Sequence, residues 1–417
     1  MSWQRPLRFC MITTFYPPYH FGGDGVYVQA LSNELTWRGH DVTVIHDKDA
    51  YRFLAQQEPS PDKNTHPNVK VHGLASRAGW LSSLATQQTG MPLVHQKEIQ
   101  TILAQGFDVI HYHNISLVGG PRILSYGDAL KLYTLHEFWL VCPMHVLFRN
   151  NQAICDKPAC LRCSLHYGRP PQLWRYTNLL PEMVRYVDMF LAPSCFSMSE
   201  HRARGLRAPM THLPNFVAPL AGASVFPDDL AQYADTPYFL YVGRLEKLKG
   251  VQTIIPAFRN RTDARLLIAG QGNYEPELRG LARDDPNIVF VGRRNRADVQ
   301  ALMRNAIALI VPSLCYEMFP LVMVEAFQQK TPVIARKIGS LPEIIQSSGG
   351  GLTFATDAEF DSALLRLMHD RALRQELGEC GFEAYERDYT PKVHLTRYLD
   401  LVESLIEHKK AGVPVIA

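Results

Sequence analysis

The sequence lacks a hydrophobic run long enough to cross a membrane and lacks an N-terminal signal peptide. A membrane-spanning helix needs about 20 consecutive apolar residues, and no segment of the 417 residues approaches that length. The first six residues are polar, and the following apolar stretch, residues 7–12, is too short for the hydrophobic part of a signal peptide. We therefore expect a cytoplasmic protein whose contact with a membrane, if any, is peripheral and at the inner face.

A large charge excess and internal repeats are also absent. The formal net charge is +3, with 20 Lys and Arg against 15 Asp and Glu up to Leu213 and 23 against 25 beyond it. A mildly basic first half suits an anionic ligand or membrane surface, although ordinary surface variation is the better explanation for an excess of this size. We expect no nucleic-acid partner, and the sequence does not predict the oligomeric state.

Apolar strand-like runs alternate with amphipathic helical stretches from end to end. This alternation predicts an α/β protein with parallel sheets covered by helices, and the length predicts two domains. We assign residues 1–213 to the first domain and 214–390 to the second, with a proline-containing linker over 214–237 and a final helix within 391–417. The predicted strands are 8–13, 41–45, 68–73, 108–113, 129–135 and 189–192, then 238–242, 264–269, 288–291, 308–311 and 332–335.

Glycines follow the first predicted strand of each domain. Gly22, Gly23 and Gly25 precede a helix, so backbone N–H groups and the helix N-terminus could approach an anion; the alternative is a flexible turn. The Gly-x-Gly-x-x-Gly spacing of dinucleotide sites is absent. In the second domain, Gly243–Gly250 contains Arg244 and Lys249, a guanidinium and an ammonium that together suit a pyrophosphate. A solvated basic loop is the alternative here.

Two glutamates stand eight residues apart after the strand 308–311. Pro320 lies between them at a position typical of a helix start, which predicts Glu317 in the preceding loop and Glu325 inside the helix. The run between them is apolar, so a buried Glu325 needs a polar partner. On spacing alone, a carboxylate that caps a neighbouring backbone segment explains the pattern as well as a binding site does.

Taken together, these motifs resemble those of the retaining glycosyltransferases of family four. The Glu-x7-Glu spacing, the Arg244 and Lys249 loop and the Gly22-Gly23 turn occur in the family's order, and the resemblance covers nearly the whole chain. It implies the GT-B fold: two Rossmann-like, doubly wound domains that face each other across a cleft, with a C-terminal helix that crosses back to pack on the first domain. It also implies transfer of a sugar from a nucleoside diphosphate to an acceptor.

The resemblance assigns a role to individual residues. Gly22 and Gly23 would form the donor-phosphate loop, Arg244 and Lys249 would hold the leaving diphosphate without Mg²⁺, and Glu325 would accept hydrogen bonds from the ribose. Glu317 would face the donor sugar, and His136 would position that sugar and stabilise developing charge. Backbone groups of Met318, Phe319, Pro320 and Leu321 would bind sugar and phosphate, and those of Val291, Gly292 and Arg293 would read the base.

Four of the eight cysteines, Cys142, Cys155, Cys160 and Cys163, fall in the loop 142–166 of the first domain. Four thiolates hold a tetrahedral Zn²⁺ or an iron–sulfur cluster in many proteins, with His145 and His166 as substitute ligands. A disulfide or four reduced thiols are the alternatives. We expect a structural element close to His136, since Cys142 follows it closely in the chain.

Donor and acceptor identity are not encoded in these motifs. A UDP-, GDP- or ADP-sugar fits equally, and the acceptor is a saccharide, a lipid-linked molecule or a small molecule, with Trp80-Leu81 and residues 174–176 as candidate contacts. Two other functions use the same fold: a phosphorylase with phosphate as acceptor, and a non-catalytic protein that binds a sugar nucleotide or a metal. The presence of Arg244, Lys249, Glu317 and Glu325 together favours the transferase.

Overall fold

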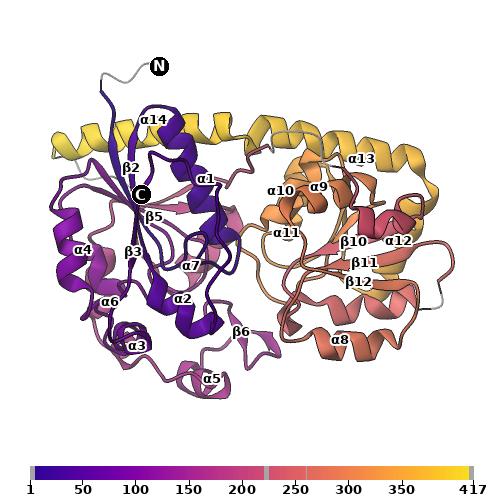
Figure 1. Ribbon diagram of the computed structural model, residues 1–417, viewed down its shortest axis with the longest axis horizontal. Helices are drawn as coiled ribbons and strands as arrows, with labels where there is room; N and C mark the ends of the chain where they lie inside the picture. Colours follow the sequence, from indigo (N-terminus) through magenta and orange to yellow (C-terminus); the bar gives the residue numbers. More distant parts are fainter. Residues whose placement is uncertain (1–4, 220–224, 260, 413–417) are drawn as a thin grey trace. The chain divides into compact units, whose positions relative to one another are not determined.

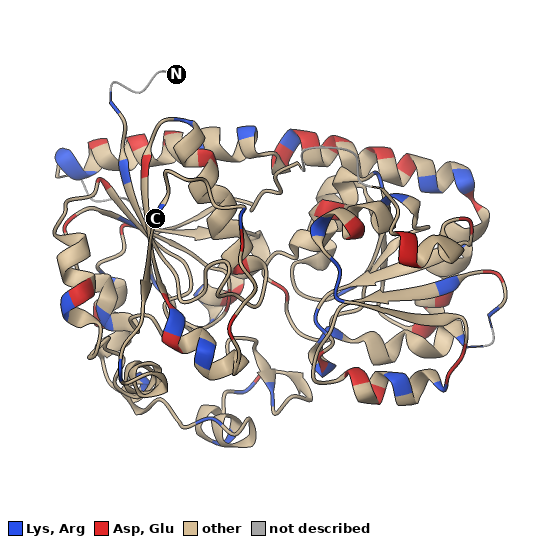
Figure 2. Ribbon diagram, in the orientation of Figure 1, with Lys and Arg blue, Asp and Glu red and all other residues tan. Residues whose placement is uncertain are grey.

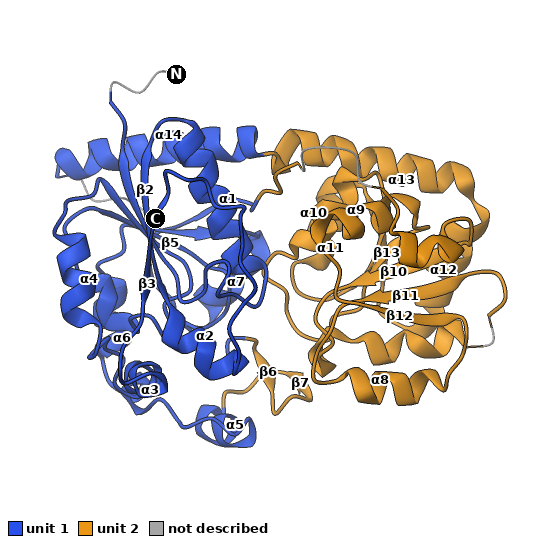
Figure 3. Cartoon of the chain, in the orientation of Figure 1, with its two compact units in different colours: residues 1–145, 159–215, 391–417 blue, residues 146–158, 216–390 orange. Residues whose placement is uncertain are grey.

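The computed structural model describes residues 5–219, 225–259 and 261–412, which form two compact units (Figures 1 and 3). Within these residues, unit 1 comprises 5–145, 159–215 and 391–412, and unit 2 comprises 146–158 and 216–390. The segment 146–158, part of the cysteine-containing loop, is thus grouped with unit 2. Of the predicted linker, residues 220–224 lie outside the described residues, and Asp228–Tyr233 forms a short 3-10 helix.

Unit 1 is built on a seven-stranded parallel sheet with the order β3-β2-β1-β4-β5-β8-β9. Its strands are β1 (Arg8–Ile12), β2 (Asp41–Asp47), β3 (Lys70–Leu74), β4 (Val109–Tyr112), β5 (Leu130–Thr134), β8 (Met189–Ala192) and β9 (Met210–His212). Its helices are α1 (Gly23–Trp37), α2 (Lys48–Ala55), α3 (Trp80–Thr89), α4 (Gln96–Leu103), α5 (Cys160–His166), α6 (Leu179–Val184), α7 (Cys195–Ala203) and α14 (Pro391–Lys410).

Unit 2 is built on a six-stranded parallel sheet with the order β12-β11-β10-β13-β14-β15. Its strands are β10 (Tyr238–Val242), β11 (Arg265–Ala269), β12 (Ile288–Gly292), β13 (Leu309–Val311), β14 (Val333–Arg336) and β15 (Gly351–Phe354). Its helices are α8 (Glu275–Ala282), α9 (Arg296–Asn305), α10 (Leu321–Gln328), α11 (Leu341–Ser348), α12 (Asp357–His369) and α13 (Arg371–Ala384). A two-stranded hairpin, β6 (Phe148–Arg149) and β7 (Ala153–Ile154), is grouped with this unit.

Both faces of the unit 2 sheet are buried, as in doubly wound folds. Successive residues of a strand point to opposite faces, and β10 shows this clearly: Tyr238 and Leu240 belong to one hydrophobic core cluster, and Phe239 and Tyr241 to another. Near-continuous apolar strands therefore form where helices cover the sheet on both sides.

The strand order reverses at one point in each sheet. In unit 1 the chain moves outward from β1 through β2 to β3, and then returns to place β4 on the other side of β1; in unit 2, β10 and β13 are the corresponding neighbours. Loops that follow such neighbouring strands diverge at their carboxyl ends, where ligands bind in open α/β sheets. The loops after β1, β4, β10 and β13 are therefore the places to look for a site.

The C-terminal helix α14 packs on unit 1, against α1 and β5. Its His394 donates a hydrogen bond from Nδ1 to the Pro214 carbonyl (2.7 Å) and accepts one at Nε2 from the Tyr27 hydroxyl (3.0 Å). At its other end, the Lys409 ammonium donates to Asp188 (2.7 Å). Figure 2 shows acidic and basic residues interspersed along the helix, which leaves its apolar stripe to face the unit.

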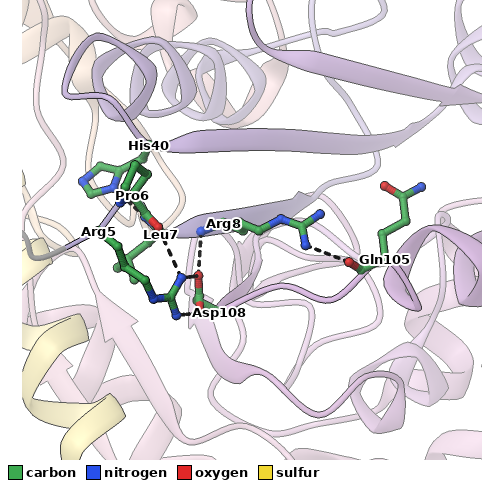
Figure 4. A network of polar contacts seen from close by, with 7 residues as sticks. All are labelled: Arg5, Pro6, Leu7, Arg8, His40, Gln105 and Asp108. Carbon is green, nitrogen blue, oxygen red and sulfur yellow. Dashed lines mark hydrogen bonds and ion pairs between the residues drawn. The ribbon is translucent and has the colours of Figure 1, made fainter.

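The start of β1 is held by a polar network around Asp108, which lies just before β4 (Figure 4). Its carboxylate accepts hydrogen bonds from the Arg5 guanidinium (2.5 and 3.1 Å) and from the Arg8 backbone N–H (2.8 Å). The Leu7 N–H donates to His40 Nδ1 (3.2 Å). These contacts fix the register of the central strand from which the first loop emerges.

The fold prediction is confirmed: two parallel-sheet Rossmann-like units with a C-terminal helix. The short edge strands β9 and β15 and the hairpin of β6 and β7 were not predicted. No helix among the described residues is long and apolar enough to span a membrane.

Candidate active site

In unit 2, the loop after β10 is packed backbone to backbone on the loop after β11. The Leu245 N–H donates to the Gln271 carbonyl (3.0 Å), and the Leu245 carbonyl accepts from Tyr274 (2.9 Å). A Cβ at Gly270 would lie 1.9 Å from the Gly243 carbonyl oxygen, and one at Gly272 would lie 2.2 Å from that of Leu245. Both positions therefore require glycine, and the Gly270-Gln271-Gly272 turn holds the loop that contains Arg244 and Lys249.

Lys249 and Glu317 form an ion pair across the point where the strand order reverses. Lys249 Nζ donates to Glu317 Oε1 (2.7 Å), and the Ser313 hydroxyl donates to the same oxygen (2.7 Å). The two loops touch closely beside this pair, since a Cβ at Gly250, where φ is +79°, would lie 2.0 Å from the Pro312 carbonyl oxygen. The two predicted residues thus meet although 68 positions separate them.

The ion pair is shielded, with 21% of the Lys249 side chain and 16% of the Glu317 side chain exposed. Burial lowers the pKa of Lys249, but the Glu317 carboxylate outweighs burial and the net pKa is raised. Burial raises the pKa of Glu317, but Lys249 and the hydrogen bonds outweigh it and the net pKa is lowered. Both groups are therefore charged at neutral pH.

Arg244 lies beside this pair with its side chain half exposed. Its guanidinium donates to Glu246 (2.8 Å) and contributes to lowering the pKa of Glu317. The structure therefore brings Arg244, Lys249 and Glu317 together, and Arg244 is the more accessible of the two cations.

Glu325 is the fifth residue of α10 and is half-buried. Burial raises its pKa, partly offset by the charge of Arg296. Within the part of the chain that the structure describes, its carboxylate makes no hydrogen bond, so the polar partner expected from the sequence is not supplied by the protein. A carboxylate in this state is available to a hydroxyl-bearing ligand.

The predicted backbone site at Met318–Leu321 coincides with the start of α10. Pro320 is the N-cap and, within the described chain, no side chain caps the helix. The first helical N–H groups, those of Leu321 and Val322, therefore face outward without a capping acceptor, an arrangement that attracts anions.

The predicted base-reading segment ends β12. The Val291 carbonyl accepts from the Arg294 side chain (2.8 Å), and the Gly292 carbonyl accepts from the Gly270 N–H (2.9 Å). Arg293 is exposed, whereas Arg294 pairs with Asp229 (2.7 Å). Both carbonyls thus already have a donor, and the role of this segment in reading the base stays a prediction.

In unit 1, Gly22 is the N-cap of α1 and Gly23 its first residue, again with no side-chain cap among the described residues. A Cβ at Gly22 would meet nothing closer than 3.8 Å, but one at Gly25 would lie 2.9 Å from the His20 Cβ. Packing therefore requires glycine at Gly25, whereas the space over Gly22 is open, as a ligand loop needs.

His136 follows β5 and belongs to a cluster of aromatic side chains from four parts of unit 1. It shares a hydrogen bond with His113 (3.0 Å), and its ring lies edge-on to Tyr27, with 5.1 Å between centroids. His111 stacks beside His113 (4.1 Å) and bonds to the Tyr398 hydroxyl of α14 (3.0 Å). Burial lowers the pKa of His136 to about 4, so this imidazole is neutral at physiological pH.

Comparison with known proteins decides the family. A family model described as Glycosyltransferase Family 4 matches residues 21–219, and one described as Glycosyl transferases group 1 matches residues 225–384. An uncharacterised glycosyltransferase of Methanocaldococcus jannaschii is 34% identical over 372 residues, 83% of this chain and 84% of that protein. The chain belongs to glycosyltransferase family 4.

Other relatives agree with this assignment. A D-inositol 3-phosphate glycosyltransferase of Pseudarthrobacter chlorophenolicus is 31% identical over 418 residues, 94% of each chain. Among solved structures, sucrose-phosphate synthase of Thermosynechococcus elongatus has a TM-score of 0.73 at 21% identity, over 96% of this chain and 99% of that one. The structural likeness supports the GT-B fold, and the sequence matches show that the protein is a glycosyltransferase.

The four cysteines of the loop 142–166 differ in how deeply they are buried. Cys142 and Cys163 are buried, and Cys155 and Cys160 are half-buried. None of the eight cysteines, all within the described residues, forms a disulfide in the structure. Within the described part of unit 1, Cys142, Cys160 and Cys163 do not form a set of three ligand atoms close enough to share an ion. The four-thiolate metal site and the subgroup it would define stay predictions.

The substitute ligand His145 is engaged elsewhere, since its Nδ1 lies 2.8 Å from the Glu137 carboxylate. Of the candidate acceptor contacts, Trp174 is buried and donates to the Gln87 carbonyl (2.9 Å), and Arg175 donates to the Trp139 carbonyl (2.7 Å). These two therefore hold the fold of the glycosyltransferase, whereas Trp80, Leu81 and Tyr176 are exposed.

One group of residues was not predicted from the sequence at all. Asp47, Asp49 and His95 converge inside unit 1. The signal that could have revealed the first two is the Asp-x-Asp step, Asp47-Lys48-Asp49, directly after a buried strand.

Proposed function

We propose that this glycosyltransferase moves a sugar from a nucleoside diphosphate to an acceptor hydroxyl with retention of anomeric configuration and without a divalent cation in the chemical step. The observation that carries the proposal is the charged cluster of Arg244, Lys249 and Glu317 beside the uncapped start of α10. Two cations and free backbone N–H groups suit a diphosphate leaving group.

The bond that breaks joins the anomeric carbon to the donor's phosphate oxygen, and the bond that forms joins that carbon to the acceptor oxygen on the same face. The acceptor proton passes to the departing phosphate oxygen. Arg244, Lys249 and the N–H groups at Leu321 and Val322 stabilise the negative charge that grows on the diphosphate. No protein group is required as a base in this scheme.

Glu317 serves chiefly to hold Lys249, because its Oε1 already accepts from Lys249 and Ser313. Glu325, a carboxylate that makes no hydrogen bond within the described chain, accepts hydrogen bonds from the ribose hydroxyls. His136, neutral at pH 7, donates or accepts a hydrogen bond at the donor sugar and helps to position it. Gly22 and Gly23 contribute backbone N–H groups to the phosphates.

The relatives support a nucleotide-linked donor. One is a GDP-mannose-dependent mannosyltransferase of Corynebacterium glutamicum, and one structural neighbour, from Anabaena, was solved with UDP-glucose. These names disagree on the nucleotide, so we propose a UDP-, GDP- or ADP-sugar for this chain without choosing among them.

A peripheral contact with the inner face of a membrane fits the exposed apolar residues of α2 and α3. Phe53 and Trp80 stack with 6.0 Å between ring centroids, and about half of each side chain is exposed, as for the neighbouring Leu54 and Leu81. Contiguous exposed apolar residues mark interaction sites. We propose that this apolar patch contacts a lipid surface, which would suit a lipid-linked acceptor.

A donor panel tests the proposed function. The true sugar nucleotide, at 100 times its dissociation constant, stabilises the protein by about 2.7 kcal/mol, and prolonged incubation releases free sugar whose initial anomer, read by NMR, matches that of the donor. Initial release of the opposite anomer would contradict retention. Turnover that depends on inorganic phosphate would indicate the phosphorylase, and binding without any turnover would indicate a non-catalytic protein.

A further inference from the structure

A second polar cluster lies in unit 1, at the carboxyl end of β2, and the proposed chemistry makes no use of it. Asp47 is the last residue of β2 and the N-cap of α2, Asp49 lies in the first turn of α2, and His95 is the N-cap of α4. One ligand atom from each of the three lies within 4.8 Å of the other two.

The three side chains are buried, and several of their polar atoms lack partners. Asp47 has no exposed surface; its Oδ1 accepts from the Ala50 N–H (3.0 Å), but its Oδ2 has no hydrogen-bond partner in the described chain. The same is true of His95 Nε2, and the Ser83 hydroxyl of α3 lies beside the Asp47 carboxylate. Unpartnered polar atoms are costly in a protein interior, so their convergence calls for an occupant.

Neighbouring polar groups hold Asp49 and lie on both sides of the His95 ring. Asp49 Oδ2 lies 3.5 Å from His95 Nε2 and is fixed by the backbone N–H and hydroxyl of Ser76, both at 2.8 Å. The other imidazole nitrogen, His95 Nδ1, lies 3.7 Å from the Glu98 carboxylate. A metal-bound histidine commonly directs its second nitrogen toward a carboxylate, which leaves the first as a free electron-pair donor.

Charge balance also favours a cation. Two carboxylates buried side by side are stable in the ionised form only with a compensating positive charge. The adjacent lysine does not supply it, because Lys48 Nζ lies over the Tyr19 ring, 5.4 Å from its centroid.

We propose that Asp47, Asp49 and His95, with the Ser83 hydroxyl as a fourth donor, bind one Zn²⁺ ion as a closed structural site. Zn²⁺ accepts histidine nitrogen and carboxylate oxygen at about 2.0–2.2 Å in four-coordinate structural sites. Mg²⁺ fits less well, since it prefers six oxygen ligands and usually keeps several waters, whereas these three buried side chains include an imidazole nitrogen.

The ion would join the end of β2 and the start of α2 to α3 through Ser83 and to α4 through His95. Two of these segments, α2 and α3, carry the exposed apolar patch and pack against each other, so the metal would help to fix that surface. It would be separate from the donor residues of unit 2 and would contribute nothing to the leaving group.

The test is a metal analysis of the full-length protein, with Co²⁺ as a spectroscopic probe. Protein purified without chelator is analysed for zinc, then stripped and titrated with Zn²⁺ or Co²⁺ alone. The variants are Asp49→Asn and His95→Gln. His201→Gln is the matched control, because His201 is another buried histidine of unit 1 with an unpartnered Nε2 but does not belong to the cluster.

We expect the wild type and His201→Gln to hold one more equivalent of Zn²⁺ than Asp49→Asn and His95→Gln, and to gain thermal stability on titration. Co²⁺ in this site gives weak visible bands without the near-ultraviolet thiolate charge-transfer absorption, which distinguishes it from a cysteine site. Cys160→Ser should keep the ion. Wild-type protein that binds no Zn²⁺ or Co²⁺ after titration, or whose metal shows thiolate bands and is lost in Cys160→Ser, would overturn the proposal whether or not the cluster variants fold.

Discussion

Replacing Lys249 by Ala removes the ammonium that Glu317 holds at 2.7 Å. If Lys249 binds the leaving diphosphate, the variant loses a charge-assisted hydrogen bond in the transition state, and each such bond contributes about 1.5–3 kcal/mol. This corresponds to a fall in kcat/KM of roughly 10- to 150-fold. The assay is initial-rate kinetics with the donor identified by the panel.

The same substitution affects stability, because it removes one of the two donors, Lys249 and Ser313, that reach the Glu317 carboxylate within the described residues. Loss of one partner from a mostly buried pair costs about 1–3 kcal/mol, measured by denaturant unfolding. The wild-type pKa of Glu317 is lowered, so its stabilising effect is present above the ordinary glutamate pKa of about 4.3 and is lost as the pH falls through the lower folded value. The stability difference between wild type and variant should therefore shrink under acid conditions.

Lys247→Ala is the matched control, since Lys247 lies in the same loop and is exposed. It should keep both kcat/KM and stability. Wild-type donor kinetics in Lys249→Ala, or equal losses in the two variants, would refute the role of Lys249 at the diphosphate.

Other outcomes follow from the same structure. Glu325→Gln should lower kcat/KM for the donor by roughly 10- to 150-fold, through about 1.5–3 kcal/mol, with unfolding unchanged; a loss confined to acceptor kinetics would argue against a ribose contact. Activity should survive brief EDTA treatment and need no added Mg²⁺ or Mn²⁺, and a Mn²⁺ requirement that tracks donor binding would contradict this. Because burial lowers the pKa of His136 to about 4, folding stability should fall as the pH drops below the ordinary histidine value of about 6.5, and less steeply in His136→Asn. Phe53→Ser with Trp80→Ser should weaken co-sedimentation with anionic lipid vesicles while turnover of a soluble acceptor is kept.

The sequence predicted the elements that are long, apolar and regularly spaced. The central strands β1, β4, β10 and β13 are almost wholly buried and mostly apolar, so the sequence pattern predicts them readily. The edge strands do not: β9 has three residues, one of them buried, and β15 begins at a glycine. Their strand conformation comes from pairing with β8 and β14, a tertiary contact that local composition does not record.

In the predicted site, too, local sequence identifies individual residues, whereas their contacts depend on tertiary packing. Motifs predicted Arg244, Lys249, Glu317 and Glu325 as residues but not the ion pair between two of them. That pair depends on β10 and β13 being neighbours, and on Gly250 allowing its loop to approach Pro312. The buried cluster at Asp47 was missed for a related reason, since His95 reaches it only through the packing of the segment before α4.

The histidine cluster of unit 1 suggests why the C-terminal helix returns to the first unit. His136 is bonded to His113, which stacks on His111, which is bonded in turn to Tyr398 of α14. Tyr27 of α1 lies against His136 and is bonded to His394, one turn before Tyr398. The orientation of His136 is therefore constrained from two directions by α14, a helix more than 250 positions away in the chain. Docking of α14 therefore helps to hold the His136 imidazole in one orientation and in its neutral form at the end of β5.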